Sequence, residues 1–291
     1  MGRHAVGEWL RRSRPCVRLF RGFLTHAECD RLRNLALPHL EPTRIDAGDM
    51  SSVRRSALGA WLPRSDANAG LWRRLDISSA DAALVGQVEH RIARASGVPL
   101  INGEPSQVLR YSVGDRYSLH PDFLDPSDEI GLANGGQRKA TFLIYLCTLP
   151  LNAGGRTIFP KCEPPLHVQP RAGDAIMWRN VHLDGRHVDV HSMHASEPVR
   201  QVGACPMEKW VFSKWLRKRR FAVDIAAFDR TAAQRRADKS TKRARQLNAQ
   251  RRHYSTAQSV LCAPAATVYS CGLCAVIPGR GFGLREARLE W

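Results

Sequence analysis

A histidine and an aspartate two residues apart form the first pattern in the sequence that could carry chemistry. His120 and Asp122 lie in residues 117–123, whose composition predicts a β-strand. Residues two apart on a strand project from the same face, so an imidazole nitrogen and a carboxylate oxygen would lie together. These are two ligands of the two-histidine, one-carboxylate site that holds Fe(II) and leaves coordination positions open. The pattern is short, and an ordinary surface strand could also carry it.

A histidine-rich segment downstream offers candidates for a third ligand. Residues 182–194 read HLDGRHVDVHSMH and contain four histidines, at positions 182, 187, 191 and 194. A third nitrogen ligand from this segment would complete the metal site.

Lys209 opens an apolar, tryptophan-rich segment that predicts a strand over 209–215. By alternation it shares one face with Val211, Ser213 and Trp215, while Trp210, Phe212 and Lys214 share the other. A buried lysine is rare unless it is paired with an anion. If Lys209 is buried, we therefore expect an anion beside it, and a dicarboxylate co-substrate would supply one. The alternative is a lysine in solvent at the edge of the strand.

Two helices are expected ahead of these segments. Thr25 and Glu28 have the spacing of a capping box at the start of a helix that Pro38 stops. Residues 80–96 carry apolar side chains at a 3.6-residue period, and Gly97 is suited to cap the helix.

From residue 104 onward the pattern becomes that of a β protein. Short apolar runs alternate with Gly, Pro, Asn and Asp, which is typical of a sandwich or barrel. We expect short strands at 16–21 and 56–62 and then at 107–112, 117–123, 140–146, 157–159, 166–168, 175–178, 187–193 and 209–215.

Composition excludes several classes of protein. The chain has 291 residues, of which 43% are hydrophobic and 24% charged, values of an ordinary globular protein. No apolar run approaches the ~18 residues of a membrane span, and the first residues lack a secretory signal, so we expect no membrane partner and a cytoplasmic location. The eight cysteines should then be mostly reduced thiols.

The positive charge is concentrated near the C-terminus. Residues 217–252 hold 13 Lys and Arg and 3 Asp and Glu, a net charge of +10 out of +17 for the chain. This segment could bind nucleic-acid phosphates, or it could be a solvated extension, and we do not expect nucleic acid to be needed for activity. Cys271 and Cys274 have the spacing of half a zinc site without a second pair.

Residues 14–221 resemble the prolyl 4-hydroxylase catalytic-subunit branch of the Fe(II)/2-oxoglutarate dioxygenases. Many motifs occur in the family's order, which makes the resemblance far more specific than any one of them. They are Gln107–Tyr111, Tyr111-x-x-Gly114-x-x-Tyr117-x-x-His120-x-Asp122, Gly135-Gly136-Gln-Arg138-x-x-Thr141, Gly154-Gly155-x-Thr157-x-Phe159-Pro160, Pro170-x-x-Gly173-Asp174, Asp184-Gly185, His194-Ala with Pro198-Val199, and Lys209-Trp210.

The resemblance implies a fold and a domain organisation. It implies an α+β, mainly β chain with a double-stranded β-helix (jelly-roll) core, N-terminal supporting helices and a basic C-terminal extension. We place the support region at 1–103, the dioxygenase core at 104–221 and a poorly ordered extension at 222–291. The oligomeric state is left open.

The resemblance also implies an activity. Fe(II), 2-oxoglutarate and O2 would together hydroxylate a peptidyl proline in a peptide or protein substrate, with decarboxylation of 2-oxoglutarate to succinate and CO2, and L-ascorbate would keep the iron reduced. By correspondence, His120, Asp122 and His194 are the iron ligands, which leaves His182, His187 and His191 outside the site.

Further residues correspond to positions around the co-substrate and the substrate. Lys209 matches the residue that pairs with the distal carboxylate of 2-oxoglutarate, and Tyr111 and Thr157 match positions that hydrogen-bond it. Tyr117, Arg138 and Trp215 match positions around the peptide.

Two departures from the family bear on these expectations. Lys209 follows His194 at a longer spacing than usual, as if 204–208 were inserted, and Arg217 stands where a histidine near the substrate is common. Two alternatives therefore remain: an oxygenase acting on another protein residue or a nucleic-acid-associated substrate, and a basic nucleic-acid-binding protein with an inactive barrel.

Overall fold

Strand β12 (Lys209–Arg217) runs through the middle of an eight-stranded antiparallel sheet. The computed structural model describes residues 7–43, 57–66, 69–185, 187–204 and 206–223. Along the major sheet the strands follow the order β1 (Glu8–Arg11), β2 (Val17–Phe20), β10 (Ala175–Arg179), β7 (Arg138–Tyr145), β12, β5 (Ser106–Tyr111), β4 (Leu58–Leu62) and β3 (Glu41–Pro42).

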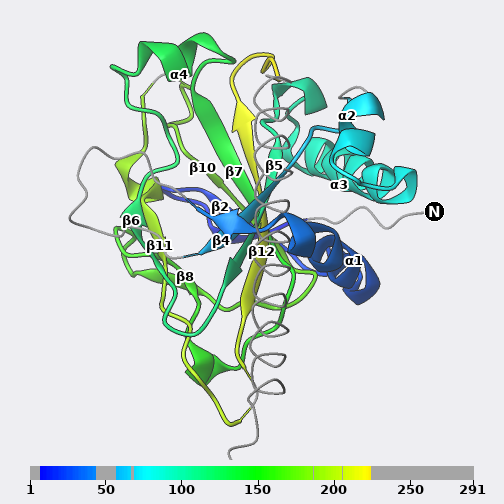
Figure 1. Ribbon diagram of the computed structural model, residues 1–291. Coiled ribbons are helices and arrows are strands. Elements are labelled where there is room, and N and C mark those ends of the chain that lie inside the picture. The colour runs from blue at the N-terminus through cyan, green and yellow to red at the C-terminus, as the bar shows by residue number, and fades with distance from the viewer. Residues whose placement is uncertain (1–6, 44–56, 67–68, 186, 205, 224–291) are drawn as a thin grey trace, which may run out of the picture. The chain divides into compact units, whose positions relative to one another are not determined.

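A second antiparallel sheet faces the first. Its order is β6 (Tyr117–His120), β11 (His194–Ser196), β8 (Thr157–Phe159) and β9 (Leu166–Val168). Figure 1 shows β6, β11 and β8 on one side of the major sheet and helices α1 (His26–Ala36) and α3 (Ser79–Ser96) on the other. The described chain is thus mainly β with a few helices, consistent with the expected jelly-roll fold.

Local sequence signals account for the two longer helices. The Thr25 hydroxyl accepts from the Glu28 backbone N–H and the Glu28 carboxylate accepts from the Thr25 N–H, so the predicted capping box is confirmed. Helix α3 begins after Ser78, whose hydroxyl accepts from the Asp81 N–H, and ends at Gly97. Gly97 has φ of 70°, a left-handed conformation that favours glycine.

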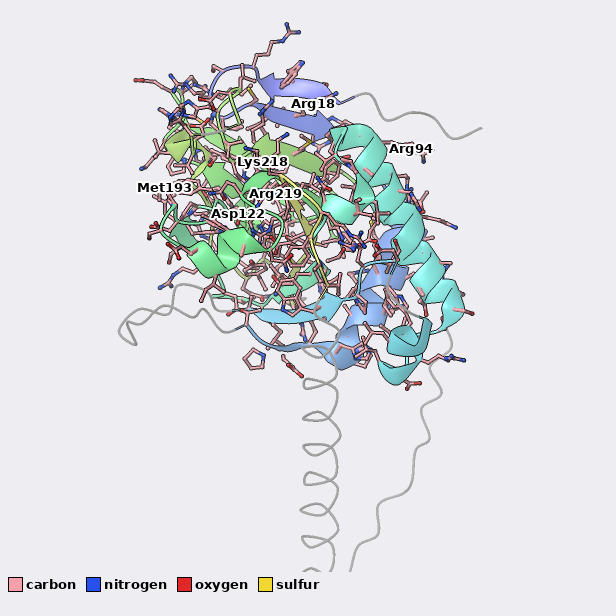
Figure 2. The ribbon with its side chains drawn as sticks, turned by 90° about the horizontal axis from the view of Figure 1, so that it is seen from above. Arg18, Arg94, Asp122, Met193, Lys218 and Arg219 are labelled. Atoms are coloured by element: carbon pink, nitrogen blue, oxygen red, sulfur yellow. The ribbon has the colours of Figure 1, made fainter. Side chains whose placement is uncertain are left out.

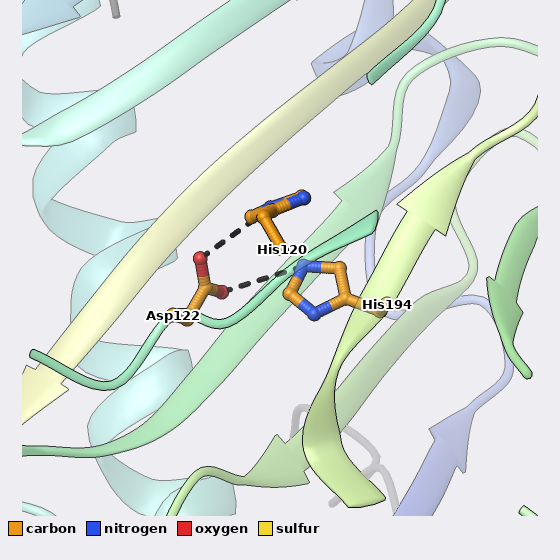
Figure 3. A group of neighbouring side chains, drawn as sticks. All are labelled: His120, Asp122 and His194. Carbon is orange, nitrogen blue, oxygen red and sulfur yellow. Dashed lines mark ion pairs between the residues drawn. The ribbon is translucent and has the colours of Figure 1, made fainter. Parts of the chain in front are cut away.

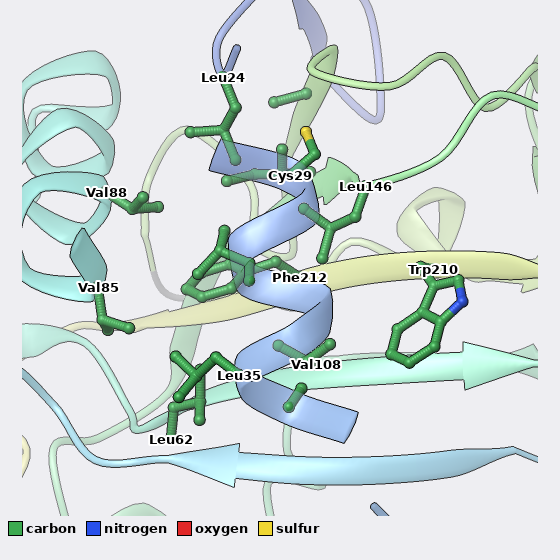
Figure 4. Close-up of a cluster of buried hydrophobic side chains, with 14 of the residues drawn as sticks. Leu24, Cys29, Leu35, Leu62, Val85, Val88, Val108, Leu146, Trp210 and Phe212 are labelled. Carbon is green, nitrogen blue, oxygen red and sulfur yellow. The ribbon is translucent and has the colours of Figure 1, made fainter. Parts of the chain in front are cut away.

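The two faces of the major sheet bury different apolar clusters. Helices α1 and α3 pack on one face, and Figure 4 shows Phe212 and Val108 of this face beneath α1. The other face buries Tyr111, Val211 and Trp178 against the minor sheet. Alternation along β12 therefore separates a structural face from a face turned toward the space between the sheets.

A buried ion pair joins helix α3 to the structural face of β12. The ammonium of Lys214 contacts the Glu89 carboxylate, and both side chains are at most 2% exposed. Glu89 also accepts from the Ser106 hydroxyl at 3.0 Å and from the Ser65 backbone N–H at 2.8 Å. Each buried charge is thus paired and hydrogen-bonded, the condition under which charges are tolerated in a core.

One predicted strand is absent from the structure. Residues 187–193 do not form a strand: Asp189 accepts from the His191 N–H and begins the 3-10 helix η4 (Val190–Ser192). The Asp189 side chain takes a backbone N–H that could otherwise bond to a neighbouring strand, and the strand begins only at His194.

Strands β1 to β4 add the N-terminal region to the major sheet, and short helices form at α2 (Ala69–Arg74) and α4 (Glu129–Ala133).

Three short 3-10 helices complete the described elements: η1 (Leu37–His39), η2 (Leu100–Asn102) and η3 (Leu151–Ala153). Residues 224–291 of the expected basic extension, with Cys271 and Cys274, lie outside the described residues. Among the helices that are described, none combines the length and apolar character needed to cross a membrane.

The buried Glu89–Lys214 pair predicts an asymmetric cost of substitution. Glu89→Gln leaves the Lys214 charge buried without a counter-charge and should lower the free energy of unfolding by about 3 kcal/mol in urea denaturation. The double variant Glu89→Gln/Lys214→Met removes both charges and should recover most of that loss. Equal stability of the wild type and Glu89→Gln would contradict this role of the pair.

Candidate active site

His120 and His194 lie directly opposite each other in the pairing of strands β6 and β11. Asp122 follows β6 after Pro121, and its Oδ1 and Oδ2 lie 3.8 Å from His120 Nε2 and 3.6 Å from His194 Nε2. Figure 3 shows the Asp122 carboxylate facing both imidazoles, with a dashed line to each. One ligand atom from each residue lies within 4.8 Å of the others, and all three side chains are buried. The predicted triad is therefore brought together.

The strand that was predicted to align His120 with Asp122 is shorter than expected. Strand β6 ends at His120, and Pro121 has no N–H to continue the ladder. Asp122 thus reaches the site from the turn after the strand and not by strand alternation. Figure 2 shows Asp122 on the β side of the molecule, away from the helix that carries Arg94.

Backbone carbonyls orient both imidazoles. His120 Nδ1 lies 2.8 Å from the Ser118 carbonyl and His194 Nδ1 lies 3.0 Å from the Ser192 carbonyl. A carbonyl only accepts, so each Nδ1 carries the proton and each Nε2 presents a lone pair to the site. Such contacts are how proteins fix the tautomer of a metal-binding histidine.

Asp122 is held as a carboxylate in spite of its burial. Burial acts to raise its pKa, but the charge that the two imidazoles carry when they are protonated, the Arg138 guanidinium and the Thr141 hydroxyl together keep the pKa below its ordinary value. Thr141 Oγ1 donates to Asp122 Oδ2 at 2.6 Å. A charged carboxylate beside two imidazole lone pairs is a donor set suited to Fe(II), with its preference for two histidines and one carboxylate.

Lys209 lies in the same pocket, at the first residue of β12. The register pairs it with Tyr111 of β5, so the longer spacing from His194 does not displace it from the pocket wall. Its ammonium donates to Ser196 Oγ at 2.8 Å and lies 5.5 Å from the centre of the Tyr111 ring.

The charge of Lys209 has no acidic partner among the described side chains. It is 1% exposed, and burial lowers its pKa to about 8, although Cys147 and Glu197 act in the opposite direction. A buried cation that lacks a counter-charge is suited to receive an anion from outside the protein. The solvent-exposed alternative considered from the sequence is wrong.

Tyr111 and Thr157 line this pocket together with the triad and Lys209. Thr157 Oγ1 accepts from the Tyr145 hydroxyl at 2.9 Å, which leaves the threonine's own proton free to donate elsewhere. Both side chains are buried, Tyr111 on β5 beside Lys209 and Thr157 on β8 beside Ser196. Their co-substrate role stays a prediction.

The three residues expected around the substrate lie near one another. Tyr117 stacks on His120 with ring centres 3.5 Å apart, and the Arg138 guanidinium lies 4.5 Å from the centre of the Trp215 ring. Tyr117 and Trp215 line the pocket. Arg138 is engaged with Glu104, through Nε to Oε1 at 2.6 Å and Nη2 to Oε2 at 2.8 Å. Their contact with a substrate stays a prediction.

Four other candidates lie outside the pocket lining. His187 is paired with Asp184 and its side chain is 75% exposed, and His191 contacts Asp189. His182 is half-buried beside His187. Arg217 contacts Glu104 and donates to the Gly136 carbonyl, so its guanidinium is engaged within the protein.

Sequence reasoning assigned no role in the site to several residues that the fold adds to it. These are Thr141, Asn180, Trp178, Ser196 and Trp61. Ser196 lies two residues after His194 and so could have been found by strand alternation. Trp61 depends on the pairing of β4 with β5, for which the sequence carries no local signal.

Comparisons with known proteins agree with this geometry. The family model of the 2OG-Fe(II) oxygenase superfamily matches residues 106–217. Probable prolyl 4-hydroxylase 6 of Arabidopsis thaliana is 34% identical over 229 residues, which cover 71% of this chain and 70% of that protein. Prolyl 4-hydroxylase 5 of the same plant is 31% identical over 233 residues, covering 72% of this chain and 70% of that protein.

A solved structure supports the fold. The viral collagen prolyl hydroxylase of Paramecium Bursaria Chlorella virus-1, in its 2OG complex, matches with a TM-score of 0.50 and 23% identity over 69% of this chain and 95% of that one. The chain therefore belongs to the prolyl 4-hydroxylase-like Fe(II)- and 2-oxoglutarate-dependent oxygenases.

Proposed function

We propose that the protein hydroxylates a peptidyl proline, using Fe(II), 2-oxoglutarate and O2 and releasing succinate and CO2. The observation that carries the proposal is one pocket that contains both the His120–Asp122–His194 triad and the Lys209 ammonium, which has no acidic partner among the described residues. The names of the relatives, prolyl 4-hydroxylases, support proline as the substrate residue. The core is proposed to be a double-stranded β-helix.

Different residues of the pocket would bind the metal and the co-substrate. The triad would hold Fe(II), which when bound supplies the activation of O2 that no side chain can provide. Lys209 would receive the distal carboxylate of 2-oxoglutarate, while Tyr111 and Thr157 offer hydroxyl groups along the same wall. We also propose that L-ascorbate is the reductant that returns oxidised iron to Fe(II), and the basis of this proposal is the family resemblance.

An aromatic wall supports a proline-containing substrate. Trp215 contacts Trp61, with ring centres 5.8 Å apart, and Trp61 is 41% exposed. The buried Trp215 Nε1 has no hydrogen-bond partner among the described residues, so it can donate to a peptide carbonyl. A peptidyl proline lacks an N–H donor, and its compact apolar ring packs well on a flat aromatic face. Tyr117 and Arg138 complete the proposed substrate side.

Loss of a triad ligand tests the chemistry. We expect His120→Ala to abolish succinate formation and the gain of one oxygen by proline peptides, as measured by mass spectrometry, because the metal loses a ligand. His187→Ala, which alters an exposed histidine outside the pocket, is the matched control and should keep wild-type turnover. Full turnover by His120→Ala would remove the proposed function.

The lowered pKa of Lys209 predicts a pH dependence of co-substrate binding. A dicarboxylate favours the protonated lysine, so affinity for 2-oxoglutarate should be highest below the Lys209 pKa of about 8 and fall by up to about tenfold per pH unit above it. Isothermal titration of the metal-loaded protein measures this. Lys209→Arg keeps its charge and should flatten the profile; a wild-type profile that is flat through about pH 9 would contradict the assignment.

The aromatic wall predicts an effect on peptide binding alone. We expect Trp61→Ala to raise the KM for a proline peptide by about tenfold, while 2-oxoglutarate turnover without peptide stays unchanged. Trp9→Ala is the control, because Trp9 is 46% exposed on β1 at the opposite end of the major sheet. Equal KM values for the wild type and Trp61→Ala would place the substrate elsewhere.

A further inference from the structure

A chain of two hydrogen bonds lies behind the Asp122 carboxylate. Thr141 Oγ1, from strand β7, donates to Asp122 Oδ2 at 2.6 Å, and Asn180 Nδ2 donates to Thr141 Oγ1 at 3.0 Å. Thr141 is 1% exposed and Asn180 is fully buried. We call Thr141 and Asn180 together the Asp122 brace.

The direction of both bonds follows from the chemistry of the groups. An ionised carboxylate only accepts, so the Thr141 hydroxyl must give its single proton to Asp122. The Thr141 oxygen can then only accept, and the Asn180 amide must turn its NH2 group toward it. Donation by Asn180 polarises the hydroxyl and strengthens its bond to the carboxylate.

Asn180 is itself held at both of its backbone groups. Its N–H donates to the Lys139 carbonyl and its carbonyl accepts from the Asp189 N–H, both at 2.9 Å. Asp189 begins η4, which ends at Ser192, and the Ser192 carbonyl orients His194. Asn180 therefore supports Asp122 through its side chain and the His194 segment through its backbone.

The brace engages only one of the two oxygens of Asp122. Oδ2 accepts the Thr141 hydrogen bond and also lies 3.6 Å from His194 Nε2, so one of its lone pairs is already used, whereas Oδ1 lies 3.8 Å from His120 Nε2 and has no bond to Thr141. A carboxylate that bound metal through both oxygens would take a position that a chelating 2-oxo acid needs. The hydrogen bond to Oδ2 opposes that second contact.

We propose that Thr141, supported by Asn180, is a positioning residue that keeps Asp122 a one-oxygen metal ligand and so keeps the site open for 2-oxoglutarate. The proposal rests on the metal and co-substrate part of the proposed function and is independent of the peptide substrate. It concerns Thr141 and Asn180, neither of which would contact the metal.

The test compares metal and co-substrate binding in Thr141→Val, which keeps the shape of threonine and removes its hydroxyl. Under anaerobic conditions, Co(II) is titrated into each protein and 2-oxoglutarate is then added, with visible absorption recording the coordination of Co(II). We expect Thr141→Val to bind Co(II) within about threefold of the wild type but 2-oxoglutarate about tenfold more weakly, with a changed Co(II) spectrum. Thr141→Ser, which restores a hydroxyl, should recover both.

A second variant and a control separate positioning from folding. Asn180→Leu removes the supporting donor and should shift the Co(II) spectrum in the same direction by a smaller amount. Thr148→Val changes an exposed threonine outside the pocket and should behave as the wild type, and thermal unfolding of each metal-free protein shows whether it is folded.

The outcomes distinguish this proposal from the proposed function. If wild-type Co(II) protein binds 2-oxoglutarate and folded Thr141→Val or Asn180→Leu gives the same spectrum and affinity, the brace has no positioning role. If Thr141→Ser is as impaired as Thr141→Val, the hydroxyl is not the cause and the proposal is overturned. If the wild type binds neither Co(II) nor 2-oxoglutarate, the brace and the proposed function both fail.

Discussion

The antiparallel pairing of β6 with β11 is the constraint on which the site depends. It places His120 and His194 opposite each other although they are far apart in sequence, and Asp122 follows in the turn after β6. A shift of one residue in this register would turn one imidazole to the other face and leave Asp122 as a buried carboxylate without its imidazole partners. Two backbone carbonyls and a threonine hydroxyl orient the triad side chains, and they can do so only in this register.

Strand β12 places two buried lysines in opposite roles. Lys214 faces the helices and is neutralised by Glu89, which makes it part of the support of the sheet. Lys209 faces the space between the sheets, where its hydrogen-bond partner is the neutral Ser196. The same strand thus carries one lysine that is paired with a carboxylate and one that has no acidic partner among the described residues. This difference, and not burial alone, is the reason why we propose that Lys209 binds the co-substrate.

The sequence predicted most of the strands and both long helices, because alternation, capping boxes and glycine caps are local signals. It predicted the triad through many ordered motifs, but the reason given for aligning His120 with Asp122 was a strand that ends earlier than expected. The histidine-rich segment was expected to be extended, and the Asp189 side chain turned it into a 3-10 helix. Trp61 and Asn180 could not be found, because their contacts with Trp215 and Thr141 depend on strands distant in sequence that pair only in the folded sheet.

The most direct measurement of the central claim is an anaerobic titration of the protein with Fe(II) and 2-oxoglutarate, followed by optical absorption. Joint binding of both in one pocket predicts a metal-to-ligand charge-transfer band that saturates at one equivalent of each per chain and is lost in His194→Ala. A wild-type protein that develops no such band, or a His194→Ala protein that keeps it in full, would contradict the claim that these three side chains hold the metal beside the keto acid.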